Sequence, residues 1–102
     1  MIKVILESPY SGNVKRNVEY ARECLKDSLK RGEAPIASHL LHTQVLDDTK
    51  TDERSMGIAA GLEWLSVADL HVFYMDHGIS PGMKHAYDNS PIDVEFRFLY
   101  ND

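Results

Sequence analysis

Hydrophobic residues along the chain gather either in short unbroken runs or at helical intervals, and the two patterns alternate. Residues 2–6 and 70–75 are apolar runs with β-branched and aromatic side chains, which is typical of strands buried on both faces. Residues 35–38 form a shorter run, and residues 94–98 alternate apolar with charged side chains, as an edge strand does. We therefore predict four strands.

Helical spacing fills the stretches between these runs. In residues 14–31 apolar side chains recur at helical spacing, with charges on the opposite face. Asn13 is suited to cap this helix and Gly32 to end it. Thr51 or Asp52 is suited to cap a second helix. Its expected core face consists of Met56, Ala59 or Ala60, Leu62 and Leu65.

A short third helix is expected after Ser80 and Pro81, which suit the cap and the first helical position, and to end before Pro91. Strands and helices then alternate, which is typical of parallel sheets joined by right-handed crossovers. We expect an α/β fold: a small doubly wound, flavodoxin-like parallel sheet of about four or five strands with helices on both faces. No linker or repeat divides the sequence, so residues 1–102 are predicted to form one domain.

Charge and composition limit the classes of molecule that the protein is expected to bind. The chain has 11 Lys and Arg against 16 Asp and Glu, for a net charge of -5, whereas duplex binding relies on neutralising phosphates. Cys24 is the single cysteine, so neither an internal disulfide nor a Cys/His metal framework is expected. Apolar runs fall short of the roughly 18 residues of a membrane helix, and the first residues do not resemble a signal peptide. We expect a cytoplasmic protein that binds neither a membrane nor duplex nucleic acid and that uses no metal ion or cofactor.

Candidate chemistry gathers in three segments that follow predicted strands. Ligands of open α/β sheets bind at the carboxyl ends of the strands, where residues 7–13, 38–48 and 76–84 are expected to meet. The first segment opens a helix, and its free N–H groups suit a phosphate or carboxylate, although no P-loop sequence follows. An ordinary turn is the alternative. Its candidate ligand-binding residues are Ser8, Pro9, Tyr10, Ser11, Gly12 and Asn17.

The other two segments add polar and titratable groups. A second anion site is expected at Ser80, Gly82, Met83 and Lys84, unless these residues only cap a helix and Lys84 is solvated. The middle segment holds His39, Gln44, Asp47 and Asp48, whose spacing matches no zinc motif. His39 is a candidate hydrogen-bonding or proton-carrying group. The aspartates form part of the site or a solvated turn, or else Arg54 holds one of them in a salt bridge.

Five further residues have simpler expected roles. His71 lies within a predicted strand and is expected to be a structural histidine, whereas His77 and His85 are expected at the surface. Trp64 is expected in the core or at a subunit interface. No base is evident beside Cys24, so we do not expect it to act as a nucleophile.

Several short motifs together resemble the nucleoside 2-deoxyribosyltransferase-like superfamily, and especially its small phage and bacterial members. One is the segment Leu-Glu-Trp-Leu-Ser-Val-Ala-Asp at residues 62–69, which leads into a strand. The others are Ser-Pro-Tyr-x-Gly, Pro-Ile-Ala-x-His-Leu-Leu, Leu-Asp-Asp and Gly-Met-Lys, at residues 8–12, 35–41, 46–48 and 82–84. The resemblance covers nearly the whole chain.

This resemblance implies a flavodoxin-like fold that binds a nucleotide, with paired subunits completing each other's pockets, and hence a homodimer or tetramer. Enzymes of the superfamily cleave the N-glycosidic bond with a glutamate nucleophile that an aspartate supports. The corresponding positions here are Ala86 and Gly61, which cannot carry out that chemistry.

We therefore expect a protein that binds a nucleotide or nucleotide derivative without the usual catalytic pair. A phage-encoded protein of this kind would act in the host cytoplasm, for example by sequestering a nucleotide immune signal. One alternative is an active nucleotide N-glycosidase or hydrolase with a relocated carboxylate, for which Asp47, Asp48 or Asp76 are candidates and His39 the acid or base. Another is an interaction module that kept only the fold.

Overall fold

The computed structural model describes residues 1–100. The elements follow the predicted order, with two additional short helical segments after β2 and a 3₁₀ turn before β3. In chain order they are β1 (Lys3–Glu7), α1 (Val14–Lys30), β2 (Ala34–Ile36), α2 (Ser38–Leu41), η1 (His42–Gln44), α3 (Thr51–Glu63), η2 (Trp64–Val67), β3 (Leu70–Tyr74), α4 (Pro81–Asp88) and β4 (Val94–Arg97).

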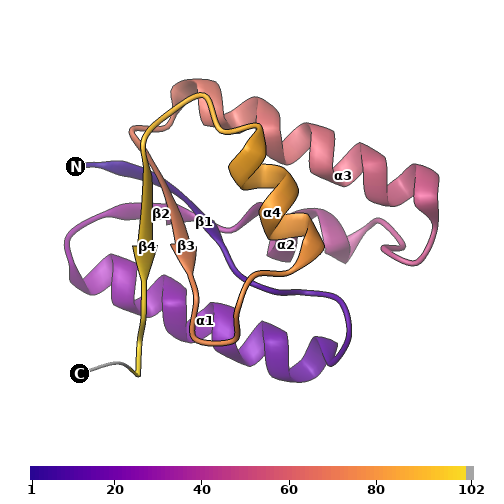
Figure 1. The fold of residues 1–102 in the computed structure, drawn as a ribbon, viewed down its shortest axis with the longest axis horizontal. Coiled ribbons are helices and arrows are strands. Elements are labelled where there is room, and N and C mark those ends of the chain that lie inside the picture. The colour runs from indigo at the N-terminus through magenta and orange to yellow at the C-terminus, as the bar shows by residue number, and fades with distance from the viewer. Residues whose placement is uncertain (101–102) are drawn as a thin grey trace.

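The four strands form one all-parallel sheet in the order β2-β1-β3-β4. This order matches the first four strands of flavodoxin-like doubly wound sheets, so the predicted α/β fold is confirmed. Helix α1 covers one face of the sheet, and α3 and α4 lie on the other (Figure 1). β4 is at an edge, as predicted.

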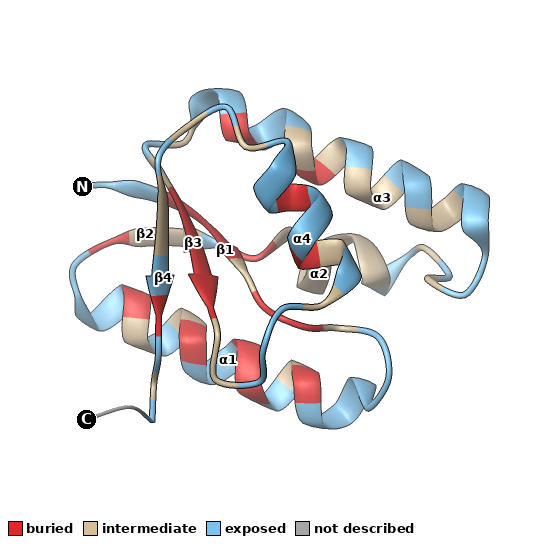
Figure 2. Ribbon diagram, viewed as in Figure 1, coloured by how far each residue is buried: buried red, intermediate tan, exposed pale blue. Residues whose placement is uncertain are grey.

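Alternation along the strands creates two hydrophobic layers (Figure 2). On the α1 side, Leu6 and Val72 pack with Tyr20 and Cys24 of α1. On the other side, Phe73 of β3 packs with residues from α3 and α4, among them Leu62, Met83 and Ala86. Burial raises the pKa of the Cys24 thiol to about 12, which keeps it protonated and unreactive at neutral pH.

Helices α1 and α4 begin as predicted. Asn13 Oδ1 accepts a hydrogen bond from the Arg16 N–H at 3.2 Å, and Ser80 Oγ accepts one from the Met83 N–H at 3.2 Å. Gly32 follows α1 with φ +82°, a left-handed conformation that glycine adopts without strain.

The expected core face of α3 is confirmed at Leu62 and Leu65 but is wrong at Met56. Met56 is 60% exposed and Ala59 is also exposed, whereas Leu65 is buried. Neither Thr51 nor Asp52 caps the helix, because Lys50 occupies the N-cap position without a side-chain bond. The cause is the direction of the helix: its C-terminal end packs on the sheet, and its N-terminal end extends away from it (Figure 1).

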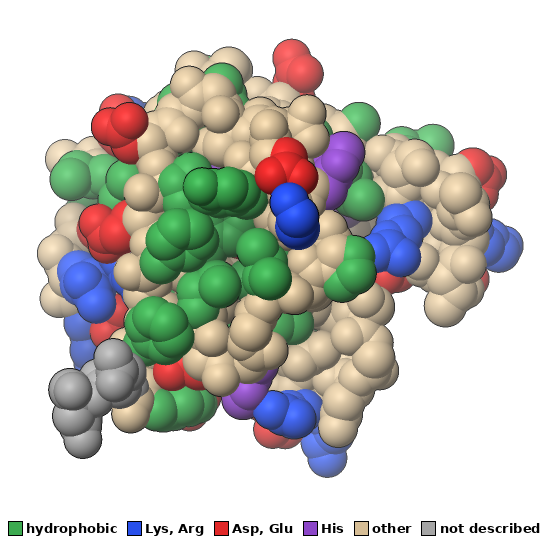
Figure 3. Space-filling model, viewed as in Figure 1, with side chains coloured by type: hydrophobic (Ala, Val, Ile, Leu, Met, Phe, Trp, Pro, Cys, Tyr) green, Lys and Arg blue, Asp and Glu red, His purple; other side chains and the backbone are tan. Residues whose placement is uncertain are grey.

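Apolar side chains also remain at the surface. Trp64 is 53% exposed, so it does not belong to the core. A second group lies over β4 and α4, where Tyr87 and Phe96 stack with ring centroids 5.7 Å apart and Phe98 is 49% exposed. Figure 3 shows this apolar patch on the face that carries α4 and β4.

Polar side chains on the α1 side, all buried except the partly exposed Asp27, form what we call the Glu33–Arg97 network: Asp27, Ser28, Glu33, Tyr74 and Arg97. Two nitrogens of Arg97 donate to the two oxygens of Glu33 at 2.8 and 2.7 Å. Ser28 also donates to Glu33, and Tyr74 donates to Asp27. The Arg97 guanidinium holds the pKa of Glu33 below its usual range, so the pair stays charged at neutral pH.

Candidate functional site

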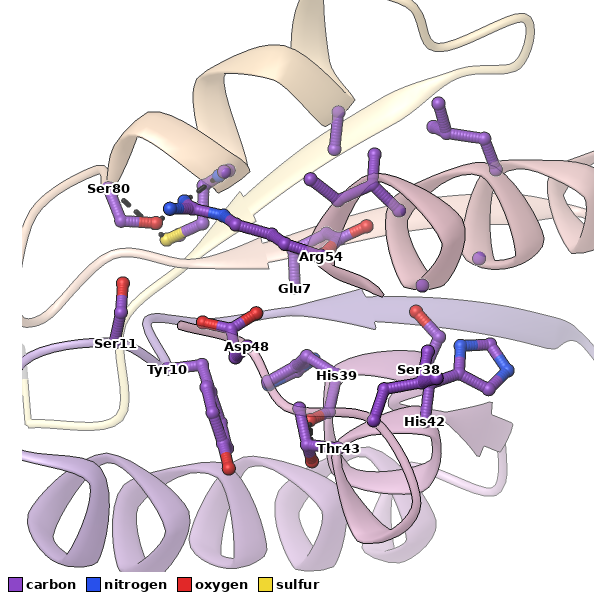
Figure 4. Close-up of a pocket in the computed structure, with 18 of the residues that line it drawn as sticks. Glu7, Tyr10, Ser11, Ser38, His39, His42, Thr43, Asp48, Arg54 and Ser80 are labelled. Carbon is purple, nitrogen blue, oxygen red and sulfur yellow. Dashed lines mark hydrogen bonds between the residues drawn. The ribbon is translucent and has the colours of Figure 1, made fainter. Parts of the chain in front are cut away.

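A pocket opens at the C-terminal end of β1, between the loop before α1, the short helices after β2, and α3 and α4 (Figure 4). Its volume is about 120 Å³, and it adjoins a hollow of about 310 Å³. Asp48, Arg54, Ile58 and Gly82 line both. The three segments predicted to converge do line one cavity, and α3 adds a fourth wall that the sequence did not suggest.

The predicted site residues divide into two groups. Eight of them line the pocket: Ser8, Tyr10, Ser11, His39, Asp48, Ser80, Gly82 and Met83. The others lie outside its walls: Pro9, Gly12, Asn17, Gln44, Asp47, Asp76 and Lys84.

Hydrogen bonds within the protein explain why several of the predicted site residues do not line the pocket. The Asn17 amide donates to the carbonyls of Tyr10 and Ser11 at 2.9 and 3.1 Å, so it fixes the shape of the loop. Lys84 is exposed and pairs with Asp88 one turn further along α4. The exposed Gln44 donates to a backbone carbonyl of α2.

Two of the nominated carboxylates have structural partners. Asp76 accepts hydrogen bonds from the Tyr20 hydroxyl at 2.5 Å and from the N–H groups of Leu99 and Tyr100 at 2.9 and 3.0 Å. Burial opposes ionisation of Asp76, but these bonds outweigh it and lower its pKa. Asp47 is exposed and accepts two hydrogen bonds from Thr49. Of the nominated aspartates, Asp48 therefore remains in the pocket.

His39 lies in the pocket wall on α2. Its Nε2 is 2.8 Å from Ser8 Oγ, and its Nδ1 is buried without a hydrogen-bond partner. Burial lowers the pKa of His39, against the opposing effect of the Glu7 carboxylate, so the ring is neutral at pH 7. Ser8 and His39 have the spacing of a nucleophile and its base, but within residues 1–100 no third group orients Nδ1, as such pairs require.

Glu7 is the most consequential pocket residue that the sequence analysis overlooked. It is the last residue of β1, and strand alternation places it on the α3 and α4 side, where it lines the pocket. Its Oε2 is 2.8 Å from Nε2 of His71, which is fully buried and also contacts Ser90 Oγ at 3.0 Å. His71 is thus the satisfied, buried histidine that the sequence predicted. A polar residue ending a buried strand was the available signal for Glu7.

Arg54 of α3 lines both cavities, and its side chain runs toward the α4 N-terminus, where Ser80 lies (Figure 4). The expected pairing with Asp47 or Asp48 is not formed, because Arg54 makes no salt bridge within residues 1–100. An arginine without a carboxylate partner in a pocket wall is available to a ligand anion.

Small residues shape the rear of the pocket. Gly61 is buried where α3 crosses α2, and a Cβ atom there would lie 2.7 Å from Ser38 Oγ. Ala86 of α4 is 5% exposed and also lines the pocket. Neither position offers a polar group to a ligand.

Fold and pocket together define a small parallel α/β domain with a ligand-sized cavity at the carboxyl end of its central strand. The chain belongs to the family described as a domain of unknown function (DUF7768), whose model matches residues 2–92. That span includes every residue that lines the two cavities. No curated protein and no solved structure matches the chain.

Among residues 1–100, no group of three or more His, Cys, Asp or Glu side chains is arranged to hold a metal ion. Within the same residues, no helix has the length and apolar character needed to cross a membrane.

Proposed function

We propose that the pocket binds a nucleotide or nucleotide derivative. The observation that carries this proposal is the division of the pocket along its length. Arg54 and the start of α4 provide cationic and N–H groups at one end, whereas Gly57, Gly61 and Leu62, which line the pocket but not the adjoining hollow, make the other end apolar. A nucleotide has the same order of an anionic phosphate, a polar sugar and a flat apolar base.

The phosphate end has a specific unpaired donor. In the first turn of α4, Pro81 has no N–H, Met83 donates to Ser80 Oγ, and Lys84 donates to the Ser80 carbonyl. The Gly82 N–H has no partner within residues 1–100, and Gly82 lines both cavities. A phosphate placed there meets this N–H, the helix dipole and the Arg54 guanidinium.

The absence of the catalytic pair favours binding without turnover. The resemblance to deoxyribosyltransferase-like proteins assigns the aspartate and glutamate positions to Gly61 and Ala86. An aspartate at position 61 would collide with Ser38, so this pocket is built for a small residue there. For a phage-encoded chain, sequestration of a nucleotide immune signal in the host cytoplasm is the corresponding biological role.

We also propose self-association as a homodimer or tetramer. The pocket opens to the surface, so a second subunit placed over it would cover the part of a nucleotide that the pocket leaves exposed. The exposed Trp64 beside α3 is the apolar group best placed to be buried between subunits.

The enzymatic alternative has one supporting observation. Three carboxylates line the pocket, Glu7, Asp48 and Glu53, so a relocated acid or base for N-glycoside hydrolysis is available. Asp47 and Asp76 are not in the pocket and are weaker candidates for that role.

The experiment is a thermal-shift screen with nucleoside monophosphates, deoxynucleotides, cyclic nucleotides and ADP-ribose, followed by chromatography of every ligand that raises Tm. We expect a shift and recovery of the intact ligand. Arg54→Gln should weaken binding about 10- to 100-fold, whereas the exposed Arg22→Gln should not. Free base and sugar phosphate would support the enzyme instead, and the absence of any shift would overturn nucleotide binding.

A further inference from the structure

Glu7, His71 and Ser90 form a chain of hydrogen bonds that runs from the pocket into the interior. His71 Nδ1 is 3.0 Å from Ser90 Oγ, and Ser90 Oγ donates to the Ile92 carbonyl at 3.0 Å. A hydroxyl has one hydrogen, so Ser90 can only accept from His71. Nδ1 of His71 must therefore carry a hydrogen.

The second nitrogen of His71 constrains Glu7. Nε2 lies 2.8 Å from Glu7 Oε2, a distance at which two unprotonated lone pairs would repel each other. One proton consequently lies between these atoms, on the carboxyl or on the ring. Either way Oε2 is occupied, and the orientation of the Glu7 carboxyl group is fixed from the interior.

The other oxygen of Glu7 remains open. Oε1 has no hydrogen-bond partner within residues 1–100, and 14% of the Glu7 side chain is exposed in a residue that lines the pocket. Asp48 has no hydrogen bond or salt bridge within the same residues. Figure 4 shows Glu7 and Asp48 in the middle of the pocket. Ser11 and Ser80 lie at one end of it, and Ser38 and His42 lie at the other.

We infer that Glu7 Oε1, together with Asp48, accepts hydrogen bonds from the two hydroxyls of a ribose, so that the pocket selects ribonucleotides over 2′-deoxyribonucleotides. This inference rests on the proposed function. With the phosphate at Arg54 and the base at the apolar end, the sugar occupies the middle of the pocket, where the two open carboxylates lie. Acidic side chains recognise the ribose 2′-hydroxyl in the same way in dinucleotide-binding folds.

His71 is a positioning residue in this arrangement. It does not line the pocket, and it acts by holding Glu7 at the angle at which Oε1 faces the ligand. A 2′-deoxy ligand has no hydroxyl to donate to Oε1. Because this oxygen is largely shielded from water, the missing hydrogen bond lowers the affinity for the deoxy ligand.

The test is calorimetric titration of the wild-type protein with AMP, GMP, CMP and UMP and with their 2′-deoxy counterparts. The best ribonucleotide should bind at least about tenfold more tightly than its deoxy form. Glu7→Gln should reduce that ratio to a few-fold, while Glu63→Gln, an exposed change on the same helix as Arg54, should leave it unchanged.

Equal binding of ribo and deoxy forms by the wild-type protein would overturn the inference while leaving nucleotide binding intact. Loss of affinity for both forms alike in Glu7→Gln would also overturn it, because Glu7 would then contact another part of the ligand. If no nucleotide binds, both the inference and the proposed function fail.

A ligand-free measurement tests the positioning role. Nitrogen-15 NMR of the wild-type protein should show His71 Nδ1 carrying a hydrogen, with Nε2 sensitive to Glu7→Gln. A His71 ring protonated on Nε2 alone would contradict the hydrogen-bond chain. His71→Gln should lower the ribo-to-deoxy ratio without removing binding of the deoxy form, a pattern that general destabilisation would not produce.

Discussion

The Glu33–Arg97 network and the pocket contain the same kinds of side chain, but they differ in how their hydrogen bonds are completed. In the network, both Glu33 oxygens accept from Arg97, and Ser28 and Tyr74 add further bonds. In the pocket, Glu7 Oε1, the Arg54 guanidinium and His39 Nδ1 have no partners within the described residues.

This difference separates side chains that support the fold from side chains that are available to a ligand. Buried polar atoms in folded proteins are almost always hydrogen-bonded, so a network in which they all have partners within the protein needs no further explanation. Several open groups lining one cavity indicate that the missing partner is a ligand. The following substitutions test whether the two regions differ in this way, beginning with the largest expected effect.

Arg97→Met should reduce the free energy of unfolding by about 3–5 kcal/mol, because it leaves the Glu33 carboxylate buried without its partner. Urea denaturation followed by circular dichroism measures this loss. The double variant Glu33→Met with Arg97→Met should recover most of the stability. A loss below about 1 kcal/mol in the single variant would show that the network does not stabilise the fold.

Gly61→Ala should destabilise the protein by about 1 kcal/mol, since overpacking against Ser38 outweighs the gain in helix propensity. Ser38→Ala removes the oxygen that the new methyl group would meet at 2.7 Å. The double variant should therefore be more stable than the sum of the two single changes predicts. Strict additivity would mean that the close approach of α2 and α3 does not constrain position 61.

Stability should decline between pH 7 and pH 5 because of His39. Burial lowers its pKa in the folded state, whereas the unfolded side chain titrates near 6.5. The unfolded chain therefore binds a proton first, and stability falls as the pH drops below about 6.5. His39→Gln should flatten this decline in urea titrations at each pH, and the exposed His85→Gln should not. The lowered pKa values of Asp27 and Glu33 affect stability only at more acidic pH.

Arg54→Gln should change the free energy of unfolding by no more than about 0.5 kcal/mol, because Arg54 makes no salt bridge among residues 1–100. This is the smallest expected effect on stability, although the same variant should weaken ligand binding strongly. Thermal unfolding without ligand measures it. A large loss of stability would show that Arg54 supports the fold and is not a group left available for a ligand.

The sequence predicted the strands, the three longer helices and the convergence of three loops, because hydrophobic periodicity and turn residues are local signals. The sequence could not reveal that Asp76 is already hydrogen-bonded within the protein, since the partners of Asp76 lie on α1 and in the segment after β4. It also missed the Glu7–His71 contact. That contact depends on the register of β1 against β3, which pairs Ile5 with His71 and Glu7 with Phe73.

The same reasoning explains the error on α3. Its apolar positions suggested a helix buried along its length, but Met56 is exposed and Gly57 instead lines the pocket. Periodicity indicates which side chains share a helix face, whereas the neighbouring elements decide how much of that face is covered.

The central pairing of the sheet also determines how the chain can reach its native state. β1 pairs on one side with β2 and on the other with β3, where Val4 lies opposite Leu70. All strand contacts are parallel, so no hairpin is available to form early, and most of the chain must be present before the sheet's middle can close. Such long-range pairing makes folding slow for a chain of this size. Changes at the β1–β3 boundary should therefore act mainly on the rate of folding, and changes at the exposed end of α3 on the rate of unfolding.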